Sequence, residues 1–239
     1  MKSRYFIILF SVFVLFYGCR HSENIISKHY QNEKLLKGTF SAEFDIRLEN
    51  VGYSKKKAKL VERLVYQSKN FDEYFAFAED EFIKTINDND FLPVIGEDGN
   101  EYYNQSYFNE SYNILHYNDS YIIIEYNIYY VLSSAAHGNI RTEYFIIDIA
   151  QERLLGINDI ATPLPDNFLD DIIKENYNVD QYLRDNIWPP DTININHDGV
   201  ELVWNVYTIT PYSEGIISIT LQNDTFLTKK GKEIKAKIR

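Results

Sequence analysis

Two long segments of alternating hydrophobicity, joined by a turn of small residues, constrain the fold of this chain more than any other feature. They cover residues 121–132 and 140–149, and residues 133–139 form the turn. One face of the first segment carries Ile122, Ile124, Tyr126, Ile128, Tyr130 and Leu132, and the other carries Tyr121, Glu125, Asn127 and Tyr129. A period of two with one apolar face is typical of a strand packed on a core. The stretch therefore predicts a hairpin of two long, half-buried strands.

Further strands and helices follow from the same reasoning about periodicity. Alternation predicts strands at residues 39–49, 101–117, 192–196, 200–207 and 216–221. The pair Asp198-Gly199 lies between two of these segments and is a strong signal for a hairpin turn. A helical period predicts helices at residues 54–66, 70–86, 166–177 and 180–187.

The first 18 residues have the pattern of a secretory signal peptide. Lys2 and Arg4 precede an apolar run at residues 5–17, which is shorter than the roughly 20 residues that span a bilayer. A small residue, Gly18, stands directly before Cys19, the only cysteine of the chain. This arrangement predicts a lipoprotein signal at residues 1–18 and lipidation of Cys19, which would attach the protein to a membrane of the cell envelope. The alternative is an ordinary signal peptide with an incidental cysteine.

The charge of the chain limits its partners. The net charge of −11 becomes −13 once Lys2 and Arg4 leave with the signal peptide. An acidic protein is repelled by nucleic acid and by anionic lipid headgroups, so we expect neither as a partner. A cationic partner would be attracted.

Changes in composition suggest a division of the mature chain. Residues 19–37 are polar with scattered apolar positions and are interpreted as a tether. Residues 38–100 are assigned to a small N-terminal α/β subdomain and residues 101–228 to the main α+β domain. Residues 229–239 are interpreted as a frayed basic tail.

The sequence carries no specific catalytic or metal-binding pattern. The five histidines lack the spacing of metal ligands, and neither a phosphate-binding glycine loop nor a nucleophile motif occurs. The acidic run at residues 79–81 is interpreted as a solvated helix face. We therefore expect neither a catalytic site nor a metal or other cofactor, although distant carboxylates could still meet in the fold.

Two side chains have both a structural and a functional interpretation. His137 could fix a bend by bonding nearby backbone, with Gly138 taking a positive φ and Asn139 tolerating one. Alternatively, His137 could face a ligand at the rim of the sheet. Tyr212 could pack under a loop set by Pro211, or it could project as a rigid aromatic anchor for a partner.

Three segments in order resemble the extracytoplasmic domain family of the lysozyme-sensing anti-sigma factor RsiV, which also accompanies some polysaccharide deacetylases. The first is the turn Ser134-Ala135-Ala136-His137-Gly138-Asn139, which follows a strand. The second covers residues 145–160, where Asp148, Leu154 and Asp159 match. The third comprises Asp198-Gly199-Val200 and residues 207–215, including Pro211, Tyr212, Glu214 and Gly215. The chain departs from the family pattern within Gln151-Glu152-Arg153, where the usual turn glycine is replaced.

The resemblance implies an α+β fold in which helices pack on an antiparallel sheet, and a binding role without catalysis. Gly138, Asp159, Gly199 and Gly215 would belong to the structural motif, and the Pro-Tyr loop would be a contact site. The expected function is a lipid-anchored envelope protein that binds a lysozyme-like hydrolase or another protein through His137, Asn139, Pro211, Tyr212 and Glu214. A peptidoglycan-binding accessory protein is the alternative, and an enzyme acting on cell-wall material is a third hypothesis.

Overall fold

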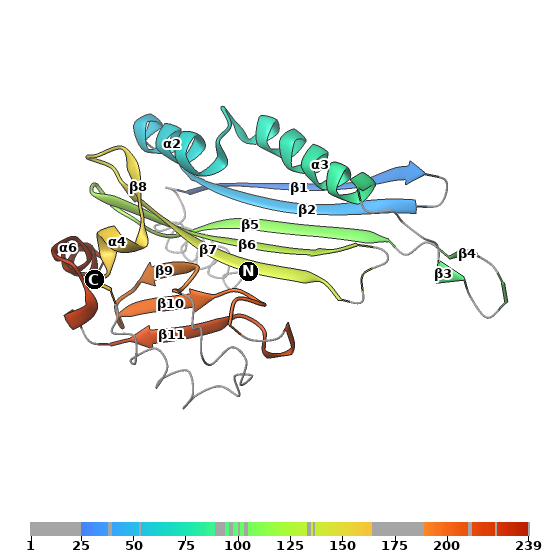
Figure 1. The fold of residues 1–239 in the computed structure, drawn as a ribbon. Helices are drawn as coiled ribbons and strands as arrows, with labels where there is room; N and C mark the ends of the chain where they lie inside the picture. Colours follow the sequence, from blue (N-terminus) through green and yellow to red (C-terminus); the bar gives the residue numbers. More distant parts are fainter. Residues whose placement is uncertain are drawn as a thin grey trace, which may run out of the picture.

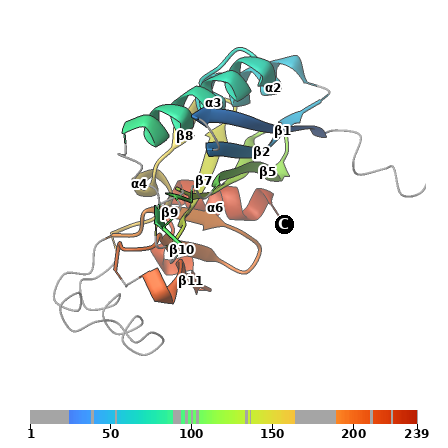
Figure 2. The same ribbon diagram turned by 90° about the vertical axis from the view of Figure 1, so that its right-hand side faces the viewer.

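The computed structural model describes residues 25–37, 40–52, 54–88, 94–95, 98–99, 101–102, 105–132, 135, 137–163, 189–209, 212–222 and 224–238. Its elements form three layers (Figure 1). Helices cover one face of a six-stranded sheet, and a three-stranded sheet lies against part of the other face (Figure 2). The predicted α+β fold class is confirmed. None of the helices in the described ranges has the length and apolar character needed to cross a bilayer.

The six-stranded sheet contains both strands of the predicted hairpin. Its strands, in spatial order, are β1 (Ile25–Lys37), β2 (Phe40–Val51), β5 (Ser106–Tyr117), β6 (Tyr121–Val131), β7 (Asn139–Asp148) and β8 (Arg153–Leu155). Neighbouring strands are antiparallel except β2 and β5, which are parallel. This exception arises because the chain crosses over the sheet through helices between these two strands. The crossover also includes the small hairpin of β3 (Val94–Ile95) and β4 (Glu101–Tyr102).

Capping residues set the start of each helix in the helical layer. Helix α2 (Lys55–Val61) starts after Ser54, whose hydroxyl accepts a hydrogen bond from the backbone N–H of Lys57 at 3.4 Å. It continues into the π-helical segment η1 (Glu62–Tyr66). Helix α3 (Phe71–Asp88) starts after Asn70, whose side-chain oxygen accepts from the N–H of Glu73 at 2.9 Å. Both predicted helices are confirmed here.

The apolar face of the sheet packs on these helices. Phe82 of α3 meets Phe44 of β2 edge to face, with 5.6 Å between ring centroids. Ile122 and Ile124 of β6 belong to the same core, and neither is exposed at all. The predicted apolar face of the central strand therefore does lie on a core.

A second core lies on the opposite face, where the sequence predicts polar surroundings. Strands β9 (Thr192–Ile195), β10 (Val200–Trp204) and β11 (Ile217–Leu221) form the three-stranded sheet. Trp204 is fully buried there and packs in one cluster with Tyr121 and Ile123 of β6. The assignment of Tyr121 to a polar face is thus wrong at this end of the strand, because the small sheet covers it.

The predicted tether and the predicted domain boundary need correction. Residues 25–37 form strand β1, which pairs with β2 over its whole length. Since β2 also pairs with β5, one sheet runs across the proposed boundary at residue 100. The interpretation of residues 79–81 as a solvated helix face is also partly wrong. Glu79 is only 7% exposed, because Lys34 of β1 pairs with it at 2.9 Å and Asn32 donates a hydrogen bond to it at 2.7 Å.

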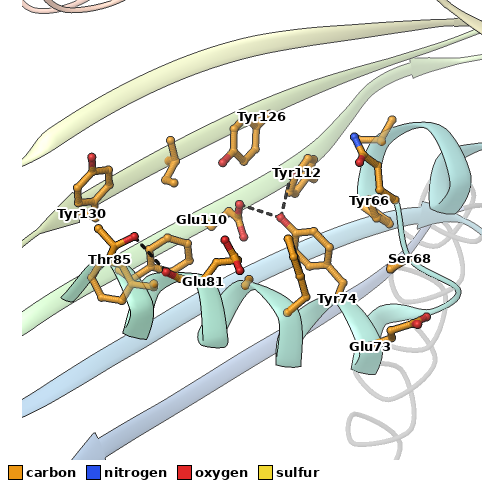
Figure 3. A pocket seen from close by; sticks show the side chains of 17 residues that line it. Tyr66, Ser68, Glu73, Tyr74, Glu81, Thr85, Glu110, Tyr112, Tyr126 and Tyr130 are labelled. Carbon is orange, nitrogen blue, oxygen red and sulfur yellow. Dashed lines mark hydrogen bonds between the residues drawn. The ribbon is translucent and has the colours of Figure 1, made fainter. Parts of the chain in front are cut away.

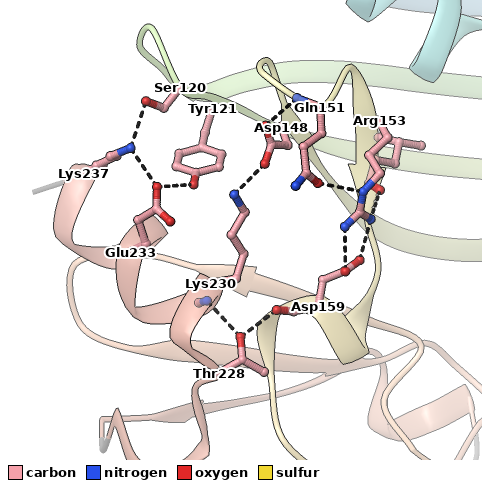
Figure 4. Close-up of polar contacts among 12 residues, drawn as sticks. Ser120, Tyr121, Asp148, Gln151, Arg153, Asp159, Thr228, Lys230, Glu233 and Lys237 are labelled. Atoms are coloured by element: carbon pink, nitrogen blue, oxygen red, sulfur yellow. Dashed lines mark hydrogen bonds and ion pairs between the residues drawn. The ribbon is translucent and has the colours of Figure 1, made fainter.

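The C-terminal segment is a packed helix and not a frayed tail. Helix α6 (Lys229–Lys237) starts after Thr228, whose hydroxyl accepts from the N–H of Gly231 at 3.0 Å. Its Ile234 is fully buried in the second core, next to the short helix α4 (Ile157–Ile160). Glu233 accepts a hydrogen bond from the hydroxyl of Tyr121 at 2.9 Å (Figure 4).

Several predictions lie outside the described residues. These are the signal peptide, the lipidation site Cys19 and the helices at residues 166–177 and 180–187.

Candidate functional site

Three aromatic side chains from two loops meet beside the end of the β6–β7 hairpin. His137 stacks on Tyr212 of the 3-10 turn η2 (Tyr212–Glu214), with 4.1 Å between ring centroids and 18° between ring planes. The hydroxyl of Tyr207 lies 2.8 Å from Nε2 of His137. In the neutral imidazole, Nδ1 donates to the carbonyl oxygen of Gly138 at 2.9 Å, and Nε2 accepts the hydroxyl proton of Tyr207. The fold thus joins two residues that the sequence singles out and adds Tyr207 to them.

The position of Tyr207 is set by polar contacts on either side of it. Asp191 accepts hydrogen bonds from the backbone N–H of Asn205 and from the hydroxyl of Thr208, both at 2.7 Å. The amide side chain of Asn205 accepts from the N–H of Thr142 at 2.7 Å and donates to its carbonyl oxygen at 3.1 Å. These contacts tie the loop to strand β7 and leave Tyr207 58% exposed.

The backbone of Tyr207 is held in an uncommon conformation. Its φ of 67° lies in the left-handed region, which is rare for a residue with a bulky side chain. Such strain persists only where the surrounding structure enforces it, and it concentrates at functional sites.

Gly138 provides room for another aromatic ring. Its φ is not positive, so that part of the sequence prediction is wrong. A Cβ at Gly138 would instead lie 2.5 Å from Cε2 of Tyr129, whose ring passes close over the backbone. The Tyr129 ring is 37% exposed and contacts Tyr107 at 6.2 Å between centroids. We call the five residues Tyr107, Tyr129, His137, Tyr207 and Tyr212 the aromatic strip.

The other residues predicted for binding are only partly placed. Asn139 is exposed, and its side chain donates to the hydroxyl of Tyr130 at 2.9 Å. Pro211 and the side chain of Glu214 lie outside the described residues. Gly215 ends the η2 turn with a φ of 74°, and its N–H bonds the carbonyl oxygen of Tyr212 at 3.0 Å.

The two remaining motif residues, Gly199 and Asp159, make contacts that support the fold. A Cβ at Gly199 would lie 2.1 Å from the carbonyl oxygen of Leu221, so β10 and β11 approach too closely there for any side chain. Asp159 receives two hydrogen bonds from Arg153, at 2.7 and 2.8 Å (Figure 4). It also accepts one from the N–H of Gly156 at 2.9 Å. Arg153 and this N–H lower the pKa of Asp159 to about 2.

A pocket that the sequence analysis missed lies between α3 and strands β5 and β6 (Figure 3). Its volume is about 600 Å³, within the range of small-molecule sites. Glu110 of β5 lies inside it and is only 3% exposed. Oε1 of Glu110 accepts from the hydroxyl of Tyr74 at 2.8 Å, which in turn lies 2.9 Å from the hydroxyl of Tyr112. Oε2 has no hydrogen-bond partner of normal geometry among the described residues.

Burial dominates the electrostatics of this carboxyl group. Desolvation raises the pKa of Glu110 to about 7, although the hydroxyls of Tyr74 and Tyr126 act in the opposite direction. Burial, followed by the charge of Glu110, raises the pKa values of Tyr74, Tyr112 and Tyr126 far above the usual value of 10. The tyrosines therefore remain neutral hydroxyl donors at physiological pH, and Glu110 is poised to titrate.

The sequence does carry a signal for this pocket. Phe108, Tyr112 and Ile114 alternate along β5 on the buried face, and Glu110 occupies the same face. A carboxylate at the strand period among apolar residues is an anomaly, because its burial is costly unless hydrogen bonds or a charged partner compensate it.

Among the described residues that line the pocket, Glu110 is the one buried carboxylate. Besides Glu110, the carboxylates that line this pocket are Glu73 and Glu81, which pair at the surface with Lys69 at 3.9 Å and with Lys84 at 2.5 Å. Within the described ranges, no three His, Cys, Asp or Glu side chains are close enough to hold a metal ion.

Comparison with known proteins places the second half of the chain in context. Residues 151–224 match the family model described as "Protein of unknown function (DUF3298)". This segment contains Asp159, Gly199, Tyr207, Tyr212 and Gly215. His137 and the pocket lie before it. No curated protein sequence matches the chain significantly.

Two crystal structures of DUF3298 proteins share the fold. One, from Bacteroides fragilis NCTC 9343, has a TM-score of 0.60 and 15% identity, and the match covers 91% of this chain and 100% of the other. The second, from Pseudomonas aeruginosa PAO1, has a TM-score of 0.56 and 15% identity, and the match covers 87% and 96% of the two chains. The structural similarity to these DUF3298 proteins therefore extends beyond the matched segment, over most of this chain.

Proposed function

We propose that this protein is a lipid-anchored binding protein of the cell envelope, which recognises a cationic protein such as a lysozyme-like hydrolase through the aromatic strip. The observation that carries the proposal is the stack of His137 on Tyr212 beside the exposed Tyr207. Tyrosine rings of this kind are frequent anchors in protein interfaces, because they bury a large area at a small cost in conformational entropy.

The fixed geometry of the strip supports a binding role. Three of the rings come from two loops that lie far apart in sequence, and the hydrogen bond between Tyr207 and His137 links these loops. The other two rings, Tyr107 and Tyr129, come from strands β5 and β6. Because Asp191 and Asn205 hold the loop of Tyr207, little ordering would be required on binding. The arrangement presents ring faces that could interact with Lys or Arg side chains of a partner.

Charge favours the same class of partner. With the signal peptide removed, the net charge of −13 would steer a cationic protein toward the surface and raise its association rate. The resemblance to the RsiV-like domain, which implies a contact through the Pro-Tyr loop, motivates lysozyme as the first partner to test. Lipidation of Cys19 would hold the binding surface at a membrane.

A binding measurement with matched variants tests this proposal. The chain from residue 20 onward, which includes every described residue, is titrated with lysozyme by calorimetry. We expect Tyr212→Ala and Tyr207→Ala each to weaken binding by on the order of 2 kcal/mol. Phe77→Ala is the control, because Phe77 and Tyr207 are both 58% exposed but Phe77 lies on α3, across the sheet. Absence of lysozyme binding, or equal losses in all three variants, would contradict the proposed interface.

Peptidoglycan is the second candidate ligand, because exposed tyrosine rings can also stack on sugars. Tyr129 and Tyr207 have this exposure, whereas Trp204 is fully buried and unavailable. Co-sedimentation with purified peptidoglycan separates the candidates. Retention of the wild-type protein and its loss in Tyr207→Ala, without lysozyme binding, would favour the glycan.

A further inference from the structure

We propose that the pocket between α3 and strands β5 and β6 binds a small organic cation, a protonated amine that carries an apolar group and donates an N–H to Oε2 of Glu110. The site is separate from the aromatic strip and does not depend on the function proposed for it. Figure 3 shows Glu110 between the helix and the strands, with tyrosine side chains around it.

The unpartnered oxygen of Glu110 defines what the ligand must supply. The side chain is more than nine-tenths buried, and among the described residues only Oε1 accepts a hydrogen bond of normal geometry, from Tyr74. The hydroxyl of Tyr126 also acts on this carboxyl group, but it makes no such bond to Oε2. A buried acceptor without a partner is costly, and an ionised one more so. A ligand N–H or O–H directed at Oε2 would remove this cost, and a positive charge on the donor would strengthen the bond.

The walls of the pocket select a cation over an anion. Tyrosine rings surround the carboxylate from three elements: Tyr66 from η1, Tyr74 from α3, and Tyr126 from β6. Aromatic faces attract a cation through the ring quadrupole. The described lining contains acidic side chains but no Lys, Arg or His, so an anionic ligand would find no cation to pair with and would be repelled by the carboxylates.

The remaining lining is apolar and indicates the rest of the ligand. Phe82, Phe108 and Ile128 contribute apolar wall, and Phe77 is 58% exposed although it lines the pocket. The volume of about 600 Å³ exceeds the needs of a bare ammonium ion. An alkyl or aryl group attached to the amine would occupy this space.

The same observations exclude two other cations. A quaternary ammonium ion has no N–H and would leave Oε2 unsatisfied. A metal ion needs several oxygen ligands, and no cluster of three acidic, His or Cys side chains exists in the described part of the chain. A primary or secondary amine meets both requirements of the pocket.

Calorimetry at pH 8 with hexylammonium as the probe tests the proposal on the full chain. An alkylammonium remains protonated at this pH, as the lysine side chain does. We expect a dissociation constant on the order of 1 mM or tighter, in line with a small ligand of this size. The neutral probe 1-hexanol and the quaternary probe tetramethylammonium should each bind at least tenfold more weakly.

Two variants identify the residue responsible. Glu110→Gln keeps the shape of the side chain but removes its charge, and it should weaken hexylammonium binding at least tenfold. Glu73→Gln is the matched control, because Glu73 lines the same pocket with its side chain 46% exposed and paired with Lys69. This control should change affinity less than twofold. Thermal unfolding of both variants verifies that they are folded.

The pH dependence of the wild-type protein provides a readout without any mutation. The tyrosines around Glu110 are Tyr74 of α3, Tyr66 of η1, Tyr112 of β5 and Tyr126 of β6, all of which stay neutral below pH 9. The other carboxylates of the lining, Glu73 and Glu81 of α3, pair at the surface with Lys69 and Lys84. Affinity for hexylammonium should therefore rise between pH 6 and pH 8, as Glu110 loses its proton. Equal binding of hexanol and hexylammonium, a flat pH profile, or unchanged affinity in Glu110→Gln would overturn the proposal.

Discussion

Nζ of Lys230 lies 2.6 Å from Oδ2 of Asp148, so that an ion pair joins helix α6 to the end of strand β7 (Figure 4). The Asp148 side chain is 2% exposed and that of Lys230 is 28% exposed. Burial by itself raises the pKa of Asp148, but hydrogen bonds from Lys230 and from the backbone N–H of Gln151 bring it below its usual value. The C-terminal helix is thus held to the sheet by charge as well as by the burial of Ile234.

Removing the cation of this pair should destabilise the fold. We expect Lys230→Met to lower the free energy of unfolding by about 3 kcal/mol at pH 7, because Asp148 would stay buried without its partner. Chemical denaturation measures this loss. Since the pKa of Asp148 is lowered in the folded state, the stabilisation is present above the unfolded pKa of 3.8 and disappears as the pH falls below it.

The double variant Lys230→Met/Asp148→Asn is the control for this pair. It removes both charges but keeps an acceptor for the N–H of Gln151, which bonds Oδ1 of Asp148 at 2.9 Å. The double variant should therefore be more stable than Lys230→Met alone. A larger loss in the double variant would show that the buried charge is not the cause.

Glu110 should make the free energy of unfolding depend on pH in the direction opposite to that of Asp148. Its pKa rises from 4.5 to about 7 on folding, so the unfolded chain releases the proton first as pH increases. The contribution to stability is greatest below pH 4.5 and is lost as pH rises toward 7. Between pH 5 and pH 8 the wild-type protein should lose on the order of 2 kcal/mol more unfolding free energy than Glu110→Gln. Parallel pH profiles of the two proteins would refute a raised pKa.

The turn before β8 contains a residue in a conformation that suits glycine. Glu152 has a φ of 52°, in the left-handed region that glycine adopts without strain. We expect Glu152→Gly to be more stable than Glu152→Ala by about 1 kcal/mol, because only a residue with a Cβ is strained there. Both variants lose the same exposed ion pairs to Lys56 and Arg63, so these losses do not contribute to the difference in stability between the variants. The same pair of substitutions at Gln151, which has no positive φ, should show no advantage for glycine.

Gly199 is required by close packing rather than by its dihedral angles. A Cβ would lie 2.1 Å from the carbonyl oxygen of Leu221, so Gly199→Ala must push β10 and β11 apart. We expect a loss of about 3 kcal/mol in unfolding free energy, measured by urea denaturation. Gly156→Ala is the matched control, since its Cβ would meet no atom closer than 3.9 Å, and it should cost less than about 1 kcal/mol. Equal losses at the two positions would show that the approach of the strands is not tight.

Parts of the sheet could not be predicted from the sequence. An edge strand can pair through its backbone while its side chains stay exposed, and it then lacks the alternation that marks a strand. Strand β1 pairs with β2 along its length, but most of its described side chains are at least partly exposed. It therefore shows no clear alternation, and its polar composition resembles that of a tether. The parallel pairing of β2 with β5 is equally invisible in sequence, because it depends on how the intervening helices cross the sheet.

By itself, the sequence determined the local elements of this protein. The alternation of β6, the caps Ser54 and Asn70 and the Asp198-Gly199 turn depend on residues only a few positions apart, so their physical causes can be read along the chain. Tertiary structure alone decided the sites. Tyr207 meets His137 across 70 residues, and Tyr74 meets Glu110 across 36, in contacts that exist only once the loops and the helix have packed on the sheet. The pKa of Glu110 follows from that packing, because burial acts on a carboxyl group only after the fold has excluded water from it.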